Sequence, residues 1–348
     1  MDSIKSLQAE LIRKNLDCAL FVKQESLQPN ILYLTGYNGY GYLVVPTTDK
    51  PFLYVPPMEL EVARKTSTVD VEVAGKKLSE FFKEKGFDFK NIGIDFDNLN
   101  VHDSNSLKEK LAVNISDISS EMRALRSVKS SREIEIMQFA CRITDKILGE
   151  FVNKFKGFET ETDASAFLTY QAKLLAQGIS FEPIVASGAN AAMPHHLSND
   201  KLHNGFCVVD FGVRYKGYCS DVTRTFFIGK PSDSDKNIYN ELLLVQEDSI
   251  DKLRSGVCIS GLYDSAKRVL GERFTHSLGH GLGIEVHEDP NISSKTEGLF
   301  KKNMVVTIEP GVYVSGKYGI RIEDDLIVAD GKPKALSRFS KELVILPK

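Results

Sequence analysis

The stretch 206–229 places two aspartates in an otherwise apolar sequence that is typical of strands. It reads FCVVDFGVRYKGYCSDVTRTFFIG, with apolar and β-branched runs on both sides of the turn-like segment RYKG at 214–217. This pattern predicts a β-hairpin. A turn centred on the middle of RYKG places Asp210 directly opposite Asp221, although a β-bulge would shift that register. Aspartate is depleted in strands and facing like charges destabilise a sheet, so this pair requires a neutralising group.

A second stretch repeats the arrangement with glutamates. Residues 305–328 read VVTIEPGVYVSGKYGIRIEDDLIV, and a turn centred on Gly316 places Glu309 opposite Glu323. The two hairpins would bring their carboxylates into one apolar setting, which raises carboxylate pKa values and costs several kcal/mol per buried ion. Two divalent cations would remove that cost, because carboxylates can bridge metals that lie about 3.5–4 Å apart.

A histidine-rich stretch lies between the two hairpins. Residues 275–290 read THSLGHGLGIEVHEDP and contain His276, His280 and His287. Their spacing could match one face of a helix, but the alternating glycines of GHGLG disfavour a helix and therefore a helical zinc-protease motif. Glycines on both sides of His280 indicate instead a close approach by backbone or ligand. Carboxylates with a minority of imidazole suit Mn, Co, Fe or Zn.

Each of these residues has an ordinary explanation when it is taken alone. An aspartate in a strand is more often an edge or bulge residue, and a lone histidine is more often a surface or core residue with its hydrogen bonds satisfied. Acidic pairs on two hairpins, with a glycine-flanked histidine between them, favour a two-metal centre over these separate explanations.

The elements that must position these residues follow from the hydrophobic pattern. Strand-like and helical runs alternate in the first third of the chain, which predicts a small α/β domain. The predicted strands cover 19–22, 41–45, 51–55 and 92–94, and the predicted helices cover 59–65, 78–85 and 106–111. A basic, serine-containing connector follows, and then Ser130 and Glu133 have the spacing of a capping box. We place the boundary near residue 123, which gives domains 1–123 and 124–348.

The C-terminal domain is predicted to contain two similar modules, each with helices followed by strands. Helices are expected at 133–155 and 161–176 before the first hairpin, and at 236–254 and 260–270 before the second. Sequence identity between the modules is negligible, so an internal duplication stays open. The predicted fold class is α+β.

Composition narrows the class of protein. A chain of 348 residues favours two domains, and a net charge of −3 gives no overall attraction to nucleic acid or anionic membrane. No apolar run approaches the roughly 18 residues of a membrane helix, and the first residues lack the apolar core of a signal peptide. The five cysteines are scattered without a CxxC pair, which suits reduced thiols. We expect a soluble, cytoplasmic protein.

The ordered motifs of the C-terminal domain together resemble a known family. They are PHH at 194–196, DFG and SDVTRT within 210–225, HSLGHGLGIEVHEDP at 276–290, TIEPGVY at 307–313 and GIRIEDD at 319–325. These motifs are similar to those of the pita-bread metallopeptidases, which include Xaa-Pro dipeptidases (prolidases), Xaa-Pro aminopeptidases and methionine aminopeptidases. The resemblance implies a creatinase/prolidase-like N-terminal α/β domain followed by a pita-bread catalytic domain. Methionine aminopeptidases generally lack such an N-terminal domain, so the Xaa-Pro branch is favoured.

The resemblance also implies a set of metal ligands. Asp210 would bind one metal, His280 and Glu309 would bind the other, and Asp221 and Glu323 would bridge the two. The expected cofactors are two divalent metal ions, Mn or Co in the first place and Zn or Fe as alternatives. Creatinases share the fold but replace metal ligands, and the full ligand set is present here. Its presence disfavours both a metal-free creatinase and an inactive pita-bread module that binds partners.

Three histidines match the family's pocket histidines, which lie beside the metals and contact substrate or intermediate. They are His195, His276 and His287. Of two adjacent histidines we choose His195 because it directly follows Pro194, whereas His196 and His203 are expected at the surface. We predict that Glu309 moves a proton from the nucleophile to the leaving nitrogen. His276 and His287 would donate hydrogen bonds to charge that develops on the carbonyl oxygen.

The expected substrate is a proline-containing peptide. The bond before proline is a tertiary amide without an N–H, so its recognition must depend on ring shape and carbonyl contacts. Prolidases commonly carry an arginine just after the HExP segment, suited to pairing a dipeptide's carboxylate, but this chain has Asn291 there. Arg321 or a residue of the N-terminal domain would then take that substrate-binding role. We favour an Xaa-Pro dipeptidase, with an Xaa-Pro aminopeptidase acting on longer peptides as the alternative. The resemblance implies a homodimer.

Overall fold

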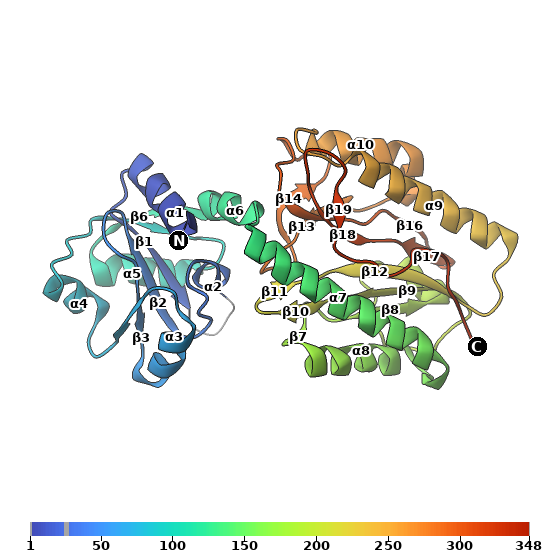
Figure 1. The fold of residues 1–348 in the computed structure, drawn as a ribbon, viewed down its shortest axis with the longest axis horizontal. Helices are drawn as coiled ribbons and strands as arrows, with labels where there is room; N and C mark the ends of the chain where they lie inside the picture. Colours follow the sequence, from blue (N-terminus) through green and yellow to red (C-terminus); the bar gives the residue numbers. More distant parts are fainter. Residues whose placement is uncertain (1, 24–27, 348) are drawn as a thin grey trace. The chain divides into compact units, whose positions relative to one another are not determined.

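The computed structural model describes residues 2–23 and 28–347, and the chain forms two compact units. They are Met1–Arg126 and Ser127–Lys348, and each is described by itself below (Figure 1). Within the described part of the chain, every helix is too short or too polar to cross a membrane.

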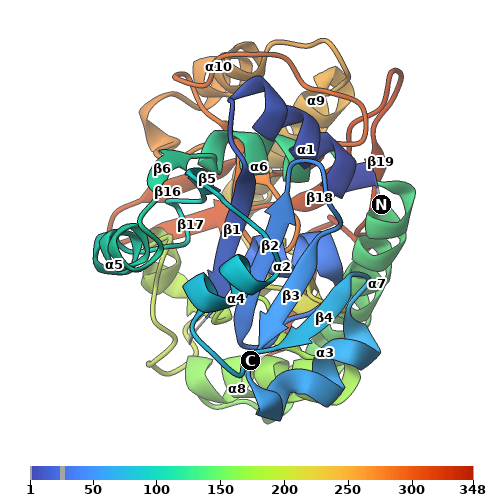
Figure 2. The ribbon, with the colours of Figure 1, turned by 90° about the vertical axis from the view of Figure 1, so that its left-hand side faces the viewer.

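The N-terminal unit is built on a six-stranded sheet with helices on both faces (Figure 2). The strand order is β4-β3-β2-β1-β5-β6. The strands are β1 (Cys18–Lys23), β2 (Gly41–Pro46), β3 (Phe52–Val55), β4 (Asp70–Val73), β5 (Asn91–Ile94) and β6 (Asn114–Asp117), and the helices are α1 (Asp2–Arg13), α2 (Pro29–Thr35), α3 (Leu60–Thr66), α4 (Leu78–Glu84), α5 (Val101–Leu111) and α6 (Ser119–Ser127), with a short 3₁₀ helix at Pro57–Glu59. Alternate residues of β1 enter different cores: Ala19 packs with α1 and α2, and Leu20 packs with α4 and α5. The four predicted strands are present, and the sequence interpretation missed β4 and β6.

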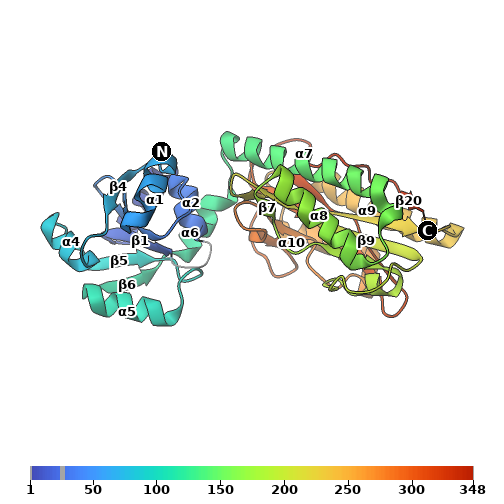
Figure 3. The same cartoon turned by 90° about the horizontal axis from the view of Figure 1, so that it is seen from below.

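Four helices frame the C-terminal unit. They are α7 (Ser131–Lys154), α8 (Glu161–Leu175), α9 (Asp233–Lys252) and α10 (Ile259–Leu270), and all four predicted helices are confirmed. The predicted capping box is also confirmed: the Ser130 side chain accepts from the Glu133 N–H, and the Glu133 side chain accepts from the Ser130 N–H. Figure 3 shows α7 and α8 running along one side of this unit.

The strands of the C-terminal unit form several short sheets. The first module contributes β7 (Gly178–Ile179), β8 (Ile184–Ser187), β9 (Gly205–Phe211), β10 (Val213–Tyr215), β11 (Tyr218–Cys219) and β12 (Val222–Ile228). The second contributes β13 (Gly279–Gly281), β14 (Glu288–Ile292), β15 (Val305–Ile308), β16 (Gly311–Val314), β17 (Tyr318–Arg321), β18 (Asp324–Ile327), β19 (Lys334–Ala335) and β20 (Ile345–Leu346). The two main sheets have the orders β20-β12-β9-β8 and β14-β13-β15-β18-β19. Three-residue to five-residue 3₁₀ helices lie at Phe155–Gly157, Gly188–Ala192 (η3) and Gly271–Arg273.

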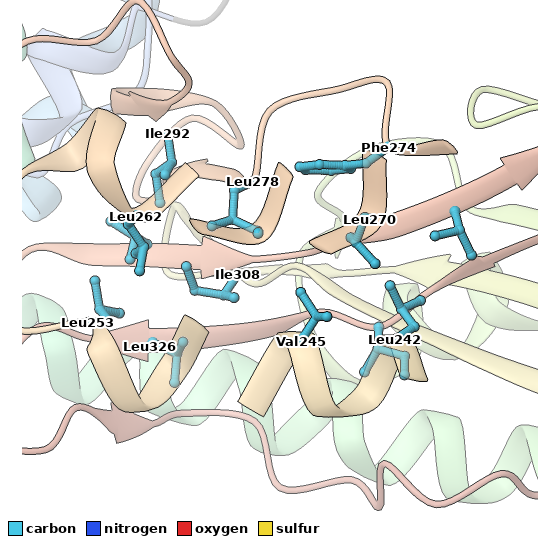
Figure 4. Close-up of a cluster of buried hydrophobic side chains, with 14 of the residues drawn as sticks. Leu242, Val245, Leu253, Leu262, Leu270, Phe274, Leu278, Ile292, Ile308 and Leu326 are labelled. Atoms are coloured by element: carbon cyan, nitrogen blue, oxygen red, sulfur yellow. The ribbon is translucent and has the colours of Figure 1, made fainter. Parts of the chain in front are cut away.

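The two helix pairs cover these sheets through separate apolar cores. Phe151 of α7 and Leu168 of α8 pack with residues of β9 and β12. In the other core, Leu242 of α9 and Leu262 of α10 pack with Ile308, as Figure 4 shows. Because each core covers one face of the strands, the strand ends between the two cores are left to carry polar groups.

The register of the first hairpin differs from its prediction. Asp210 pairs with Thr223 instead of Asp221, because the closing turn is Lys216-Gly217, one position further along the chain. Both turn residues have positive φ, +48° and +84°, as a two-residue type I′ hairpin turn requires. The resulting shift is two residues, so Asp221 stays on the same face of the hairpin as a diagonal neighbour of Asp210.

The register of the second hairpin is confirmed. Ile308 pairs with Asp324 in the β15–β18 ladder, and Gly311 pairs with Arg321 in the β16–β17 ladder. The residue pairs in both ladders are symmetric about Gly316, as expected for a turn centred there. Glu309 and Glu323 therefore face each other as predicted, but at a break between the two ladders, where neither belongs to a strand.

Candidate metal centre

Five predicted ligands come from both modules of the C-terminal unit and converge at the ends of strands. Asp210 lies in β9, and Asp221 immediately precedes β12. His280 is the middle residue of β13, Glu309 follows β15, and Glu323 precedes β18. The placement at strand ends lets the side chains leave the hydrogen-bonded ladders while the two hydrophobic cores hold the backbone.

The distances place these groups in a single cluster. His280 Nε2 lies 3.6 Å from Asp221 Oδ2 and 3.5 Å from Glu309 Oε1. Asp221, His280 and Glu323 each offer one potential ligand atom, and these three atoms lie within 4.8 Å of one another. Asp210 is near enough that its charge raises the pKa of Asp221 and Glu323.

The glycines beside His280 allow the backbone to approach it closely, as the sequence predicted. A Cβ on Gly279 would overlap the Thr307 carbonyl, and a Cβ on Gly281 would overlap the Asp289 carbonyl. The His280 ring donates from Nδ1 to the Gly281 carbonyl at 3.0 Å. That bond selects the tautomer in which the lone pair is on Nε2, the atom that faces the carboxylates.

Burial and mutual repulsion dominate the electrostatics of the cluster. Burial, followed by the charges of neighbouring carboxylates, raises the pKa of Asp221 and of Glu323 well above their usual range. Burial raises the pKa of Glu309 to about 8, with Arg321 opposing the rise. Burial also lowers the pKa of His280 to about 4, so its ring is neutral near pH 7 and able to act as a ligand.

The cluster leaves buried oxygens without hydrogen bonds. In the described part of the chain, Asp210 Oδ1, Asp221 Oδ1 and Glu323 Oε1 are buried and have no hydrogen-bond partner. A buried polar atom without a partner costs about 1–3 kcal/mol, and more if it is charged. Divalent cations would satisfy these oxygens and offset the repulsion, so the donor set fits a pair of such ions.

Contacts between the modules hold the carboxylates in place. Thr223 Oγ1 donates to Glu323 Oε2 at 2.6 Å, and the Glu323 N–H donates to the Thr223 carbonyl at 3.1 Å. The Asp221 N–H donates to Asp325 Oδ2 at 3.0 Å. Sequence reasoning missed Thr223 and Asp325, although both are polar residues within apolar strands of the quoted motifs, the same signal that identified the ligands.

Arg321 holds Asp210 and makes two further hydrogen bonds. Its Nη2 donates to Asp210 Oδ2 at 2.7 Å, Nη1 donates to the Tyr313 hydroxyl at 2.9 Å, and Nε donates to Thr223 Oγ1 at 3.1 Å. The side chain is only 5% exposed. Arg321 was predicted to contact substrate, and the structure shows it in contact with Asp210, a metal-ligand candidate.

The predicted pocket histidines lie around the cluster in different settings. The His287 ring is exposed and contacts the His280 ring with 4.4 Å between centroids. His195 is also exposed, and its charge lowers the pKa of both His276 and His287. Burial lowers the pKa of His276 to about 4. Its Nδ1 donates to the Ser277 carbonyl, so the neutral ring presents an accepting Nε2 to the Tyr313 hydroxyl, 3.0 Å away.

The expectation for His196 was wrong, whereas that for His203 agrees with the structure. His203 is exposed, but His196 is buried, with its Nε2 2.6 Å from Glu161 Oε2. The buried carboxylate partner is the first residue of α8, which no local pattern around the PHH motif reveals.

Comparisons with known proteins agree with this geometry. Residues 135–330 match the model of metallopeptidase family M24, and residues 4–128 match the creatinase/prolidase N-terminal domain. An Xaa-Pro dipeptidase from Pyrococcus horikoshii is 32% identical over 99% of this chain and 99% of its own length. The crystal structure of a prolidase from P. horikoshii superposes with a TM-score of 0.90, at 32% identity, covering 99% of this chain and 100% of the other. An X-Pro aminopeptidase from Thermotoga maritima superposes with a TM-score of 0.91, at 28% identity, covering 98% and 100%.

Proposed function

Because the chain belongs to metallopeptidase family M24 and carries a creatinase/prolidase N-terminal domain, we propose that it hydrolyses the peptide bond before proline, as an Xaa-Pro dipeptidase. The family confirms the predicted fold class and makes the chain a metal-dependent hydrolase. One observation carries the proposal for this chain: a buried acidic cluster has unsatisfied oxygens and a neutral imidazole whose Nε2 faces it.

We assign five ligands to two divalent cations. Asp210 would hold one, His280 and Glu309 would hold the other, and Asp221 and Glu323 would serve both. The raised pKa values of Asp221, Glu309 and Glu323 support this assignment, because burial, followed by the charges of neighbouring carboxylates, disfavours their ionised forms and bound cations would offset that cost. Mn or Co is the proposed metal, since an oxygen-rich set with one imidazole suits these ions.

The cations, when bound, supply an acidified water and a polarised carbonyl. Glu309 accepts a proton from the attacking water and passes it to the proline nitrogen as the amide breaks. Its position supports this role, because it is largely buried yet 15% exposed, and its Oε1 lies 3.5 Å from Nε2 of His280, another proposed ligand.

The two exposed histidines are the proposed contacts to the substrate. His195 and His287 lie at the open side of the cluster and can donate from a ring N–H to the carbonyl oxygen or to the peptide's end. His276 is assigned a different task from the one predicted, because its neutral ring already donates from Nδ1 to Ser277. Its Nε2 accepts from Tyr313, and this bond joins it to Arg321 and Asp210.

The length of the substrate distinguishes an Xaa-Pro dipeptidase from the alternative, an Xaa-Pro aminopeptidase. The relatives named above include both an Xaa-Pro dipeptidase and an X-Pro aminopeptidase of similar coverage. Asn291 is exposed on β14 and offers no charge to a dipeptide's carboxylate, and Arg321 is occupied by Asp210. We favour the dipeptidase because the relative that spans both full lengths at 32% identity carries that name.

The experiment is a comparison of kcat/KM for Met-Pro, Met-Pro-Ala and Met-Ala with the Mn-loaded enzyme. The dipeptidase proposal predicts that Met-Pro is cleaved at least about tenfold faster than Met-Pro-Ala, which corresponds to about 1.4 kcal/mol of transition-state discrimination. The reverse order would establish the aminopeptidase alternative. Cleavage of Met-Ala as fast as Met-Pro would contradict proline specificity in both.

We propose two further properties, the oligomeric state and the location in the cell. A homodimer is proposed from the family resemblance, and sedimentation of the Mn-loaded protein at the mass of a single chain would contradict it. A cytoplasmic location is proposed because none of the cysteines is in a disulfide within the described chain, and four of the five are buried. Fractionation of the source cells tests the location.

A further inference from the structure

Glu161 is a buried carboxylate far from the metal-centre candidates in sequence. It is the first residue of α8, and its side chain is 0% exposed. Its Oε1 accepts from the Ser187 N–H at 2.7 Å and the Ser187 hydroxyl at 2.9 Å. Asn190 Nδ2 donates to it at 3.2 Å, and His196 Nε2 lies 2.6 Å from Oε2. Because an ionised carboxylate only accepts hydrogen bonds, the His196 Nε2 carries the proton.

These donors all belong to one segment of the chain. They run from Ser187, at the end of β8, through η3 to His196, and this stretch includes His195. Glu161 therefore ties both ends of the segment 187–196 to the first turn of α8. The hydrogen bond from His196 to Glu161, at 2.6 Å, is short, and short hydrogen bonds to a carboxylate are among the stronger ones in proteins. Breaking it inside the protein leaves a buried carboxylate with one donor fewer.

The other side of the segment rests on the hairpin that carries Arg321. A Cβ on Gly319, in β17, would overlap the Ala191 carbonyl, so η3 lies directly against that strand. His195 follows η3, and its charge affects the pKa of both His276 and His287. The segment is thus confined between α8 and β17, with His195 at its exposed end beside the pocket histidines.

A second histidine nearby provides a natural comparison. His203 Nε2 lies 3.2 Å from Asp200 Oδ2, but both side chains are about half exposed, at 50% and 52%. The His196 and Glu161 side chains are 7% and 0% exposed. Exposed pairs contribute little because water competes for them, whereas loss of a buried partner is costly. The two pairs differ chiefly in burial.

We propose that His196, held by Glu161, is a positioning residue that fixes His195 toward the substrate. This inference rests on the proposed function, because His195 is assigned there as a substrate contact. His196 itself faces Glu161 and acts only through the backbone that it shares with His195. The segment contains none of the five assigned metal ligands, so its displacement should affect catalysis while leaving metal binding intact.

The test compares His196→Phe with the matched control His203→Phe in the Mn-loaded enzyme. Phenylalanine keeps a ring of similar size and removes the donor to the carboxylate. We expect kcat/KM for Met-Pro to fall about 10- to 100-fold in His196→Phe, the range expected from a small misplacement of a contact group. His203→Phe should stay within about twofold of wild type, and both variants should bind as much Mn as wild type. Loss of Mn from His196→Phe, or equal losses of activity in both variants, would overturn the proposal.

A double-mutant cycle shows whether His196 acts through His195. If it does, His196→Phe should reduce kcat/KM by no more than about threefold once His195→Ala is present, because the contact that it positions is already gone. The same large factor in both backgrounds would overturn the positioning role. His196→Gln retains an N–H donor at a similar position and should recover most of the lost kcat/KM.

Hydrogen exchange gives a readout that does not depend on activity. Amides of 187–196 should exchange faster in His196→Phe than in His203→Phe, and unchanged exchange would overturn the proposal even if the wild-type enzyme cleaves no Xaa-Pro peptide. Inactive wild type with the expected exchange would instead overturn the proposed function alone. If His196→Phe does not fold, Glu161→Gln, which keeps the side-chain shape but weakens the bond, replaces it in the same comparisons.

Discussion

Residue by residue, the defining property of the centre is charge that the protein alone does not balance. Asp221 and Glu323 are buried beside Glu309, and the guanidinium of Arg321 is bonded to Asp210. Such a group of carboxylates destabilises the fold unless it takes up protons or cations. The metal-free and metal-loaded proteins should therefore respond in opposite ways when one carboxylate is neutralised.

The variant Glu323→Gln tests this at one side chain. Glutamine can still accept from Thr223 but removes one negative charge beside Glu309. We expect the chelated variant to be more stable than chelated wild type at pH 8. In Mn, the activity of the variant should fall by more than the roughly 10–100-fold that is typical when a group that only orients a metal ligand is lost. Urea unfolding in chelator and Met-Pro hydrolysis with Mn measure the two effects, with the exposed Glu342→Gln as control. A chelated variant that is less stable, with full activity in Mn, would refute the role assigned to Glu323.

The pKa of Glu309 gives a prediction about pH. Burial raises it to about 8 from an ordinary 4.5, so above pH 4.5 the folded chelated protein holds a proton that the unfolded chain has lost. The stability linked to that proton is present below pH 4.5 and is lost as the pH rises through 8. The lowered pKa of His280, about 4, acts in the opposite sense only below pH 6.5. Between about pH 6.5 and 8 the urea midpoint of the chelated protein should therefore fall, and it should level off above that range. A flat or rising midpoint in chelator would be inconsistent with a buried, protonated Glu309.

How far individual residues could be predicted depended on where their partners lie. The ligand candidates were identified because an acidic residue in an apolar strand is unusual, and this signal can be recognised from the few residues on either side of it. His196 was misjudged because its partner Glu161 is 35 positions away on α8, and only the packed fold brings the two together. Arg321 was predicted to bind substrate, and its hydrogen bond to Asp210 was not foreseen, because that contact depends on the way in which two hairpins cross.

At the scale of elements, two hairpins and one glycine-rich strand set the geometry of the centre. The hairpin prediction succeeded for the second module because Gly316 lies at the centre of its turn. It failed by two residues for the first, because the sequence gives no strong reason to prefer Lys216-Gly217 as the turn over the pair before it. The error was harmless to the site, since a two-residue shift keeps Asp210 and Asp221 on the same face.

Other elements were harder to foresee for physical reasons. The missed strands β4 and β6 are four residues long, mostly exposed, and lie at the two edges of the sheet. β4 reads DVEV and alternates polar with apolar residues over four positions only, and β6 reads NISD and has a single apolar residue, so both are too short to give a clear strand signal. In contrast, α7 was predictable because its capping box and its long apolar stripe are both local features.

The glycine beside His280 allows a prediction at this scale. A Cβ on Gly279 would overlap the Thr307 carbonyl, so Gly279→Ala should separate β13 from β15 and weaken Mn binding at His280. Gly149→Ala is the matched control, because it lies within α7 with open space around it and should stabilise the protein by about 0.5–1 kcal/mol. Mn content after dialysis and the urea midpoint distinguish the two. Unaltered Mn retention in Gly279→Ala would mean that the close approach is not required.

At the scale of the whole molecule, the centre joins two modules that also share their apolar cores, since Phe206 and Phe227 of the first module pack in the core of α9 and α10. Asp210 and Asp221 come from the first module, and His280, Glu309 and Glu323 come from the second. Metal bound between them should tie the modules together and stabilise the folded state by mass action. Sequence motifs could predict this set because each motif is local. They could not predict how much peptide the pocket accepts, since that depends on groups distant from every motif.

The most direct test of the two-metal centre is a titration of thoroughly chelated protein with Mn, in which bound Mn and Met-Pro hydrolysis are followed together. The account predicts negligible activity without metal, and activity that rises to its maximum as occupancy approaches two Mn per chain. An Asp221→Asn variant, which loses a ligand assigned to both ions, should bind less Mn and stay inactive. Full activity in the chelated protein, or saturation of the wild type without any gain in hydrolysis, would contradict the account.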